Sequence, residues 1–125
     1  MTHEIMIARE IAEKVTRAAE KAEAKSVVCV ELELGDLAFF DTAALEMWLH
    51  QELANGLAKD AAINIDVVES ALTCKDCGFR GQPEVPPYHN HHMPLPPAEC
   101  PHCGSANVAL DAKTDCILKR IELEV

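Results

Sequence analysis

The sequence has few basic residues, no long apolar run and no signal for export. Eleven basic side chains stand against 21 acidic ones, giving a formal net charge of −10. The counterion release that drives nonspecific binding to nucleic acid or anionic lipid is therefore not available. No stretch approaches the length of a membrane span, and the opening residues MTHEIMIARE lack the basic and apolar regions of a signal peptide. We expect a cytoplasmic protein that binds neither nucleic acid nor membrane.

The common catalytic signatures are also missing. The chain contains no G-x-S-x-G elbow, no phosphate-binding glycine loop and no cysteine–histidine arrangement outside its paired cysteines. We therefore predict that the protein is not an enzyme, and that any nucleotide hydrolysis linked to its function belongs to a partner.

Hydrophobic periodicity in the 125 residues predicts an α+β fold, with two helices on a three-stranded sheet. Apolar residues spaced by three and four predict a helix over about residues 4–24. Asp41 is the expected N-cap of a second helix. Alternation predicts strands over 26–34, near 63–67 and in the last ten residues. The expected inward positions are Val28, Val30, Leu32 and Leu34, then Ile63, Ile65 and Val67, and finally Ile117, Ile121, Leu123 and Val125.

The inserted segment differs in composition from the rest. All seven prolines lie between Pro83 and Pro101, and four of the six histidines lie between His89 and His102. Proline at this density disfavours helices and central strands, and few apolar residues remain to form a core. We predict two domains: residues 1–70 plus 111–125 form the α+β domain, and residues 71–110, which contain two CxxC pairs, form a small inserted zinc-ribbon domain.

Two CxxC pairs are the strongest chemical signal. Cys74 and Cys77 form one pair and Cys100 and Cys103 the other, each followed by a glycine that suits the turn. Four thiolates on two tight turns are typical of a closed, structural zinc site. The alternatives are free or disulfide-bonded cysteines, and iron held by the same four sulfurs. Cys29 and Cys116 are expected to be small buried residues and not ligands.

The start of the chain offers a second metal-binding pattern. A histidine at position three lets the terminal amine, two backbone amides and the His3 imidazole form a planar four-nitrogen set, which suits nickel(II) and copper(II). Removal of Met1 would leave three nitrogens and one open position. The alternative is an exposed histidine at a helix start with no metal role.

Together the start MTHEIMIAREI, the strand end ELELGDL and the paired cysteines resemble the HypA family of nickel metallochaperones. The resemblance covers essentially the whole chain. It implies nickel as cargo, structural zinc, and delivery to the [NiFe] hydrogenase large subunit together with a GTPase of the HypB type. It also implies nickel ligands among Met1, Thr2, His3 and Glu4. A homodimer and a urease target are left open.

This sequence departs from the family pattern at Thr2, which separates the first methionine from the His-Glu pair. The identity of the amine donor is therefore open. The resemblance also suggests one of His89, His91 and His92 as a further nickel ligand, against a solvated or adventitious histidine loop. His50 is expected on the surface or in packing. The competing function is a zinc-ribbon adaptor for protein partners, without nickel cargo.

Overall fold

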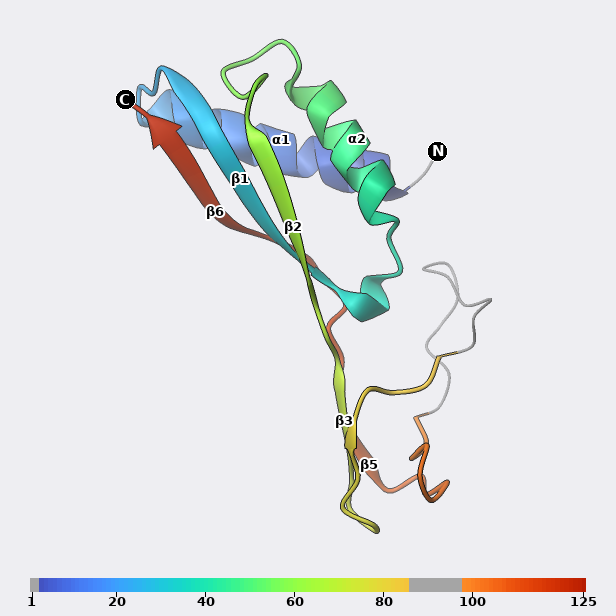
Figure 1. Cartoon of the computed structure of the whole chain (residues 1–125). Helices are drawn as coiled ribbons and strands as arrows, with labels where there is room; N and C mark the ends of the chain where they lie inside the picture. Colours follow the sequence, from blue (N-terminus) through green and yellow to red (C-terminus); the bar gives the residue numbers. More distant parts are fainter. Residues whose placement is uncertain (1–2, 86–97) are drawn as a thin grey trace. The chain divides into compact units, whose positions relative to one another are not determined.

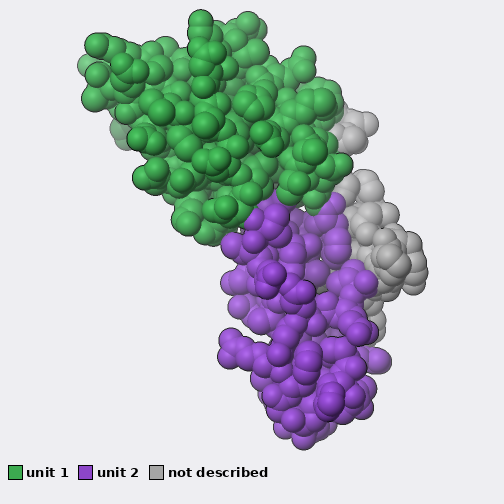
Figure 2. All heavy atoms as spheres, in the orientation of Figure 1, with its two compact units in different colours: residues 1–33, 40–66, 116–125 green, residues 34–39, 67–115 purple. Residues whose placement is uncertain are grey.

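The computed structural model describes residues 3–85 and 98–125, with the backbone only for His3. Its chain forms two compact units (Figure 2), one of residues 1–33, 40–66 and 116–125 and one of residues 34–39 and 67–115. The second unit contains the whole segment expected to form the zinc ribbon, 71–110, together with residues 34–39, 67–70 and 111–115.

The first unit has the α+β architecture that the periodicity predicted. Its helices are α1 (His3–Lys21) and α2 (Thr42–Leu53), and its strands are β1 (Ser26–Gly35), β2 (Ala62–Val68) and β6 (Cys116–Glu124). The strand order is β2-β1-β6, so the last strand of the chain pairs with the first (Figure 1). None of the helices in the described ranges combines the length and the apolar content that a membrane span requires.

Both helices are explained by their sequences. In α1 the buried side chains recur every three or four residues, which places them on one stripe facing the sheet. Helix α2 begins at the predicted cap, where the Asp41 carboxylate accepts hydrogen bonds from the backbone N–H groups of Ala43 (3.0 Å) and Ala44 (3.2 Å). A cap of this kind contributes about 1 kcal/mol to stability.

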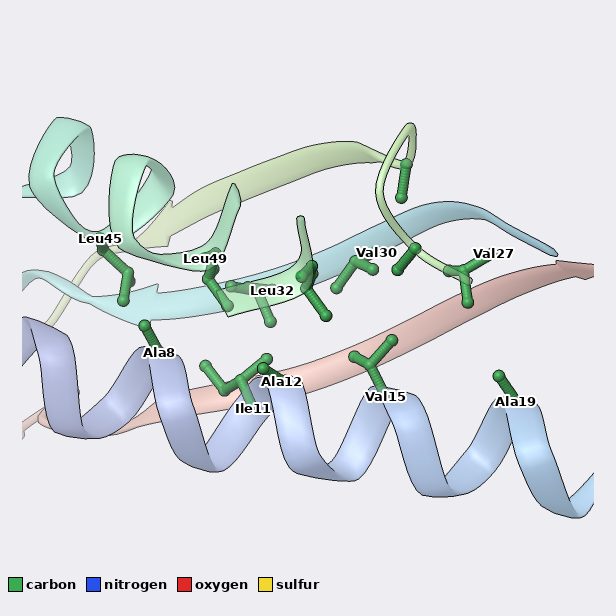
Figure 3. Packing of buried hydrophobic residues seen from close by; sticks show 13 residues of the cluster. Ala8, Ile11, Ala12, Val15, Ala19, Val27, Val30, Leu32, Leu45 and Leu49 are labelled. Atoms are coloured by element: carbon green, nitrogen blue, oxygen red, sulfur yellow. The ribbon is translucent and has the colours of Figure 1, made fainter. Parts of the chain in front are cut away.

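The core of the first unit lies between these helices and the sheet (Figure 3). It consists mainly of aliphatic side chains, and each fully buried leucine or valine contributes roughly 1.5–3 kcal/mol. Its members are Ala8, Ile11, Ala12, Val15, Ala19, Val27, Val30, Leu32, Leu45, Leu49, Leu53, Ala58 and Ala61.

The predicted strand faces were partly wrong. Val28, Val67, Ile117 and Val125 are all exposed, although the alternation placed each of them inward. On β6 the residues packed against the core are Cys116, Leu118, Ile121 and Leu123. The inward face changes phase between Leu118 and Ile121, as it does at a β-bulge. Strict alternation could not anticipate that shift.

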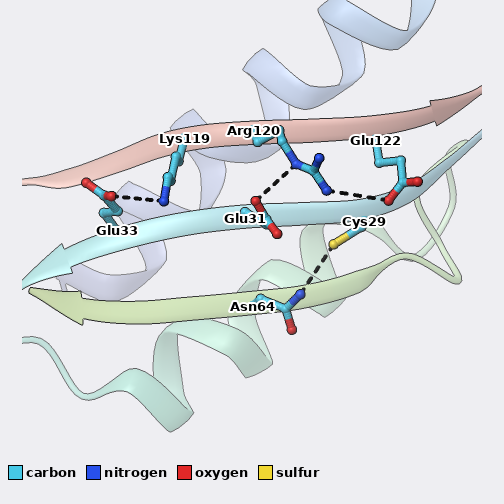
Figure 4. Close-up of polar contacts among 7 residues, drawn as sticks. All are labelled: Cys29, Glu31, Glu33, Asn64, Lys119, Arg120 and Glu122. Carbon is cyan, nitrogen blue, oxygen red and sulfur yellow. Dashed lines mark hydrogen bonds and ion pairs between the residues drawn. The ribbon is translucent and has the colours of Figure 1, made fainter.

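The outer face of the sheet is polar. Glu33 pairs with Lys119 at 3.3 Å and Glu31 with Arg120 at 3.1 Å, across β1 and β6 (Figure 4). On the other side of β1, the Asn64 side-chain amide donates to the Cys29 sulfur at 3.4 Å. Exposed pairs of this kind add little stability. They do pair opposite partners across neighbouring strands, in the same register that places the apolar face of the sheet toward the core.

The second unit contains a short helical turn, η1 (Asp36–Ala38), and three strands, β3 (Ala71–Cys74), β4 (Arg80–Gly81) and β5 (Val108–Asp111). The strand order is β4-β3-β5, with both pairs antiparallel. Leu72 is fully buried at the centre of this small sheet.

Three segments of the second unit meet at a polar cluster formed by Asp36, the buried Ser70 and the Lys113 backbone. The Asp36 carboxylate accepts from the Ser70 backbone N–H at 3.0 Å and from the Ser70 hydroxyl at 2.6 Å. The Ser70 oxygen accepts in turn from the Lys113 backbone N–H at 2.8 Å. Ser70 is only 2% exposed, so its polar atoms need these partners.

Gly35 lies at this crossing for a steric reason. Its N–H donates to the Asp115 carbonyl at 2.9 Å, and a Cβ at this position would overlap the Lys113 carbonyl group. The backbones approach too closely for any side chain.

We therefore expect Gly35→Ala to destabilise the zinc-bound protein by about 1–3 kcal/mol, the usual effect of overpacking. Gly56→Ala is the matched control, because a Cβ there meets nothing within 4 Å. The measurement is urea unfolding followed by circular dichroism. Equal urea midpoints for the two variants would show that the backbones at Gly35 and Lys113 can move apart without loss of stability.

Candidate metal centre

The two CxxC pairs fold into matching turns. The N–H groups of Gly78 and Gly104 donate to the carbonyls of Cys74 (3.1 Å) and Cys100 (2.8 Å), which closes each turn. Both glycines have φ of +78°, a backbone conformation that other residues rarely adopt. The glycines predicted to complete the two turns therefore do so for the expected reason.

The turns bring the four cysteine sulfurs together. The Sγ atoms of Cys74 and Cys103 are 3.6 Å apart, as are those of Cys77 and Cys100, and all four lie within 4.8 Å of one another. A tetrahedral site with Zn–S bonds of about 2.3 Å has sulfurs about 3.8 Å apart. The cluster therefore fits a structural zinc site, closed by four ligands.

The backbone around the cluster favours a thiolate at Cys100. Burial opposes ionisation of this thiol, but the N–H groups of Cys103 and His102, each 3.4 Å from its sulfur, together with the neighbouring Cys77 and Cys103 thiols, lower its pKa to about 6. The fold itself therefore favours the thiolate form of Cys100, which is the form that binds a metal.

Two other thiols hold their protons more strongly. A backbone hydrogen bond from Phe79 favours the thiolate of Cys77, but partial desolvation and the neighbouring sulfurs raise its pKa to about 12. Cys103 shows the same opposition: the Ser105 backbone lowers its pKa, while desolvation and the nearby Cys74 and Cys100 sulfurs raise it overall. Four sulfurs at this distance cannot all carry charge without a cation.

The N-terminal candidates are described only in part. Met1 and Thr2 lie outside the described residues, and so does the side chain of His3, whose backbone begins α1. Glu4 is buried, at 7% exposure, and its carboxylate accepts a hydrogen bond from the Asp41 backbone N–H at 3.2 Å. The start of α1 is thus fastened to the start of α2.

The other candidate histidines and cysteines are described only in part. His89, His91 and His92 lie outside the described residues. His50 is an exposed residue of α2, 3.7 Å from Glu46. Cys29 and Cys116 are half-buried on β1 and β6, and burial raises the pKa of the Cys116 thiol.

Sequence reasoning missed two acidic residues beside the candidate sites. Asp41 was predicted only as a helix cap, whereas it also lies next to Glu4 at the start of α1. Asp76 was assigned no role from the sequence. Its carboxylate accepts hydrogen bonds from the side chains of Ser105 and Asn107, which lower its pKa. The contact joins positions 29 residues apart, so no local pattern reveals it.

Zinc binding is expected to release at least two protons near neutral pH, because Cys77 and Cys103 hold theirs in the metal-free protein. Apparent affinity should fall as the pH falls, and more steeply below about pH 6, where Cys100 also takes a proton. Calorimetric titration in buffers of different ionisation enthalpy counts the protons. A count of zero would mean that all four thiols are ionised before the metal arrives.

Comparison with known proteins adds the family. The family model described as "Hydrogenase/urease nickel incorporation, metallochaperone, hypA" matches residues 1–123. Hydrogenase maturation factor HypA of Methanothermobacter thermautotrophicus is 30% identical over 122 residues, covering 98% of this chain and 97% of the relative. Its counterpart in Methanobrevibacter smithii is 32% identical over 122 residues, covering 98% and 95%.

Solved structures agree on the fold. The solution structure of the Ni metallochaperone HypA from Helicobacter pylori superposes with a TM-score of 0.61 at 22% identity, covering 98% of each chain. A second solution structure of a HypA protein gives 0.64 at 21% identity, covering 97% of this chain and 95% of that one. The chain therefore belongs to the HypA family, a family of nickel metallochaperones for hydrogenase and urease and not of enzymes.

Proposed function

We propose that this protein binds Ni(II) at its N-terminus and delivers it during maturation of a [NiFe] hydrogenase, while zinc at the four cysteines has a structural role. Family membership supports the cargo. The observation that carries the location is that α1 begins at His3. The first N–H groups of a helix have no intrahelical partner, so a metal can take their nitrogens without breaking the helix.

The proposed nickel ligands are nitrogens of the first four residues. The His3 imidazole, the amine at the start of the chain and backbone amides of Thr2, His3 or Glu4 supply a planar set of the kind Ni(II) prefers. Whether the amine is that of Met1 or Thr2 decides between four nitrogens and three.

Glu4 takes part through its backbone and not through its carboxylate. The carboxylate is buried and one of its oxygens accepts from the Asp41 N–H, so turning this side chain out toward a metal would leave that N–H unsatisfied, at a cost of about 1–3 kcal/mol. Its role in the proposed site is to fasten α1 to α2, which holds the adjoining His3 backbone in place.

Delivery needs a site that can give up its metal. A nitrogen set at the chain terminus is open to incoming ligands, whereas four thiolates leave zinc no free position. We propose that a GTPase of the HypB type and the hydrogenase large subunit are the partners in transfer, and that the protein performs no catalysis of its own. A urease is the alternative recipient, and a homodimer is the alternative to a monomer.

Nickel titration of zinc-loaded protein tests the location of the cargo. We expect wild type to bind one nickel per chain and His3→Ala to lose that binding, because the imidazole anchors the chelate. The measurement is calorimetry, with zinc content checked before and after. Unchanged binding by His3→Ala would place the cargo elsewhere or leave only a zinc-ribbon adaptor.

Two further variants sharpen this titration. Glu4→Gln keeps a side-chain oxygen for the Asp41 N–H and should still bind nickel. The triple variant His89→Ala, His91→Ala, His92→Ala tests the histidine loop as the competing site. Loss of nickel only in the triple variant would move the cargo to that loop.

A further inference from the structure

A closed ring of hydrogen bonds joins the two cysteine turns without using sulfur. One oxygen of the Asp76 carboxylate accepts from the Ser105 hydroxyl, and the other accepts from the Asn107 side-chain amide at 3.1 Å. The Ser105 oxygen accepts from the Asn107 backbone N–H at 3.0 Å. Each of the three residues thus contacts the other two, Asn107 through both its side chain and its backbone N–H.

The ring spans the two halves of the zinc site. Asp76 lies inside the first turn, between Lys75 and Cys77, while Ser105 and Asn107 form the segment that leads from the second turn into β5. Two backbone bonds run beside it, from the Lys75 N–H to the Asn107 carbonyl (3.0 Å) and from the Cys100 N–H to the Ser105 carbonyl (2.9 Å). Pairing of β3 with β5 brings the segment close to the first turn, and the side chains complete the attachment.

We propose that Asp76 is a positioning residue for the zinc site, which holds the second cysteine turn against the first through Ser105 and Asn107. The four sulfurs are then brought together in part by the protein, and zinc meets a site that is largely assembled. Such outer contacts typically change metal affinity by roughly 10- to 100-fold when removed. The proposal rests on the four-cysteine cluster and does not depend on nickel as cargo.

Electrostatics alone predicts the opposite effect of losing Asp76. Zinc with four thiolates carries a net charge of −2, and a nearby carboxylate repels that charge. Removing the carboxylate would therefore tighten zinc binding if Asp76 acted only as a charge. A positioning role predicts weaker binding, so the sign of the change distinguishes the two.

The test measures zinc release from the full-length, zinc-loaded protein to excess 4-(2-pyridylazo)resorcinol. Asp76→Ala and Ser105→Ala should each release zinc roughly tenfold faster than wild type. Ser105→Ala is informative because it opens the ring without changing the charge. Asp76→Asn, which keeps one side-chain oxygen as an acceptor, should fall between Asp76→Ala and wild type.

Glu99→Ala is the matched control, because it removes the same charge next to the other turn, at Cys100, and lies outside the ring. Zinc release from this variant should not be faster than release from wild type.

The double variant Asp76→Ala, Ser105→Ala should release zinc no faster than Asp76→Ala alone, since both changes break the same ring of hydrogen bonds. Release by Asp76→Ala at or below the wild-type rate, or unchanged release by Ser105→Ala, would overturn the proposal. If Asp76→Ala does not fold, Ser105→Ala and Asp76→Asn decide the question.

The zinc content of the wild-type protein is measured first, because the release experiment assumes that the four cysteines bind zinc. A wild type that takes up no zinc would refute the zinc site itself. Nickel binding at His3 should be unchanged in Asp76→Ala, so failure of the nickel proposal and failure of this one produce different results.

Discussion

The second unit depends on bringing four sulfurs within bonding distance of one point. Cys77 and Cys100 are separated by 22 residues, and the segment that contains them has little apolar surface to bury. Among the described residues of this unit, the buried side chains are mainly Leu34, Leu37, Ala38, Ser70, Leu72 and the two cysteines Cys74 and Cys100. Metal–sulfur bonds therefore take the place of the hydrophobic core that a unit of this size lacks. The tight turns, the two glycines with positive φ and the Asp76 ring all help to bring the four sulfurs together.

The first unit is stabilised by different physics. Its thirteen-residue apolar core lies between two helices and one face of the sheet, so it needs no metal for stability. That independence is what a carrier of a labile ion requires, because the fold must survive both the arrival and the loss of its cargo. The fastening of Glu4 to the Asp41 backbone extends this rigid framework to the first turn of α1, beside the nitrogens proposed to hold nickel.

Local signals in the sequence were reliable and long-range ones were not. The stripe of α1, the Asp41 cap and the glycines after each cysteine pair depend on neighbours a few residues away, and the structure contains all of them. The phase of β6 changes at Lys119 and Arg120, where both side chains are exposed, and alternation cannot signal such a shift. The contacts of Asp36 with Ser70 and of Asp76 with Ser105 join residues 34 and 29 positions apart, so only the folded chain reveals them. The nickel ligands remain a prediction from resemblance and helix geometry.

The central claim is that one chain holds two metals in sites of opposite character, a closed site that retains zinc and an open site that releases nickel. The most direct test is to load the protein with both metals, challenge it with excess EDTA and follow both by mass spectrometry of the intact protein. The account predicts that nickel leaves first and that the zinc-bound protein remains as a distinct species. Loss of both metals together, or nickel uptake that displaces zinc, would contradict it.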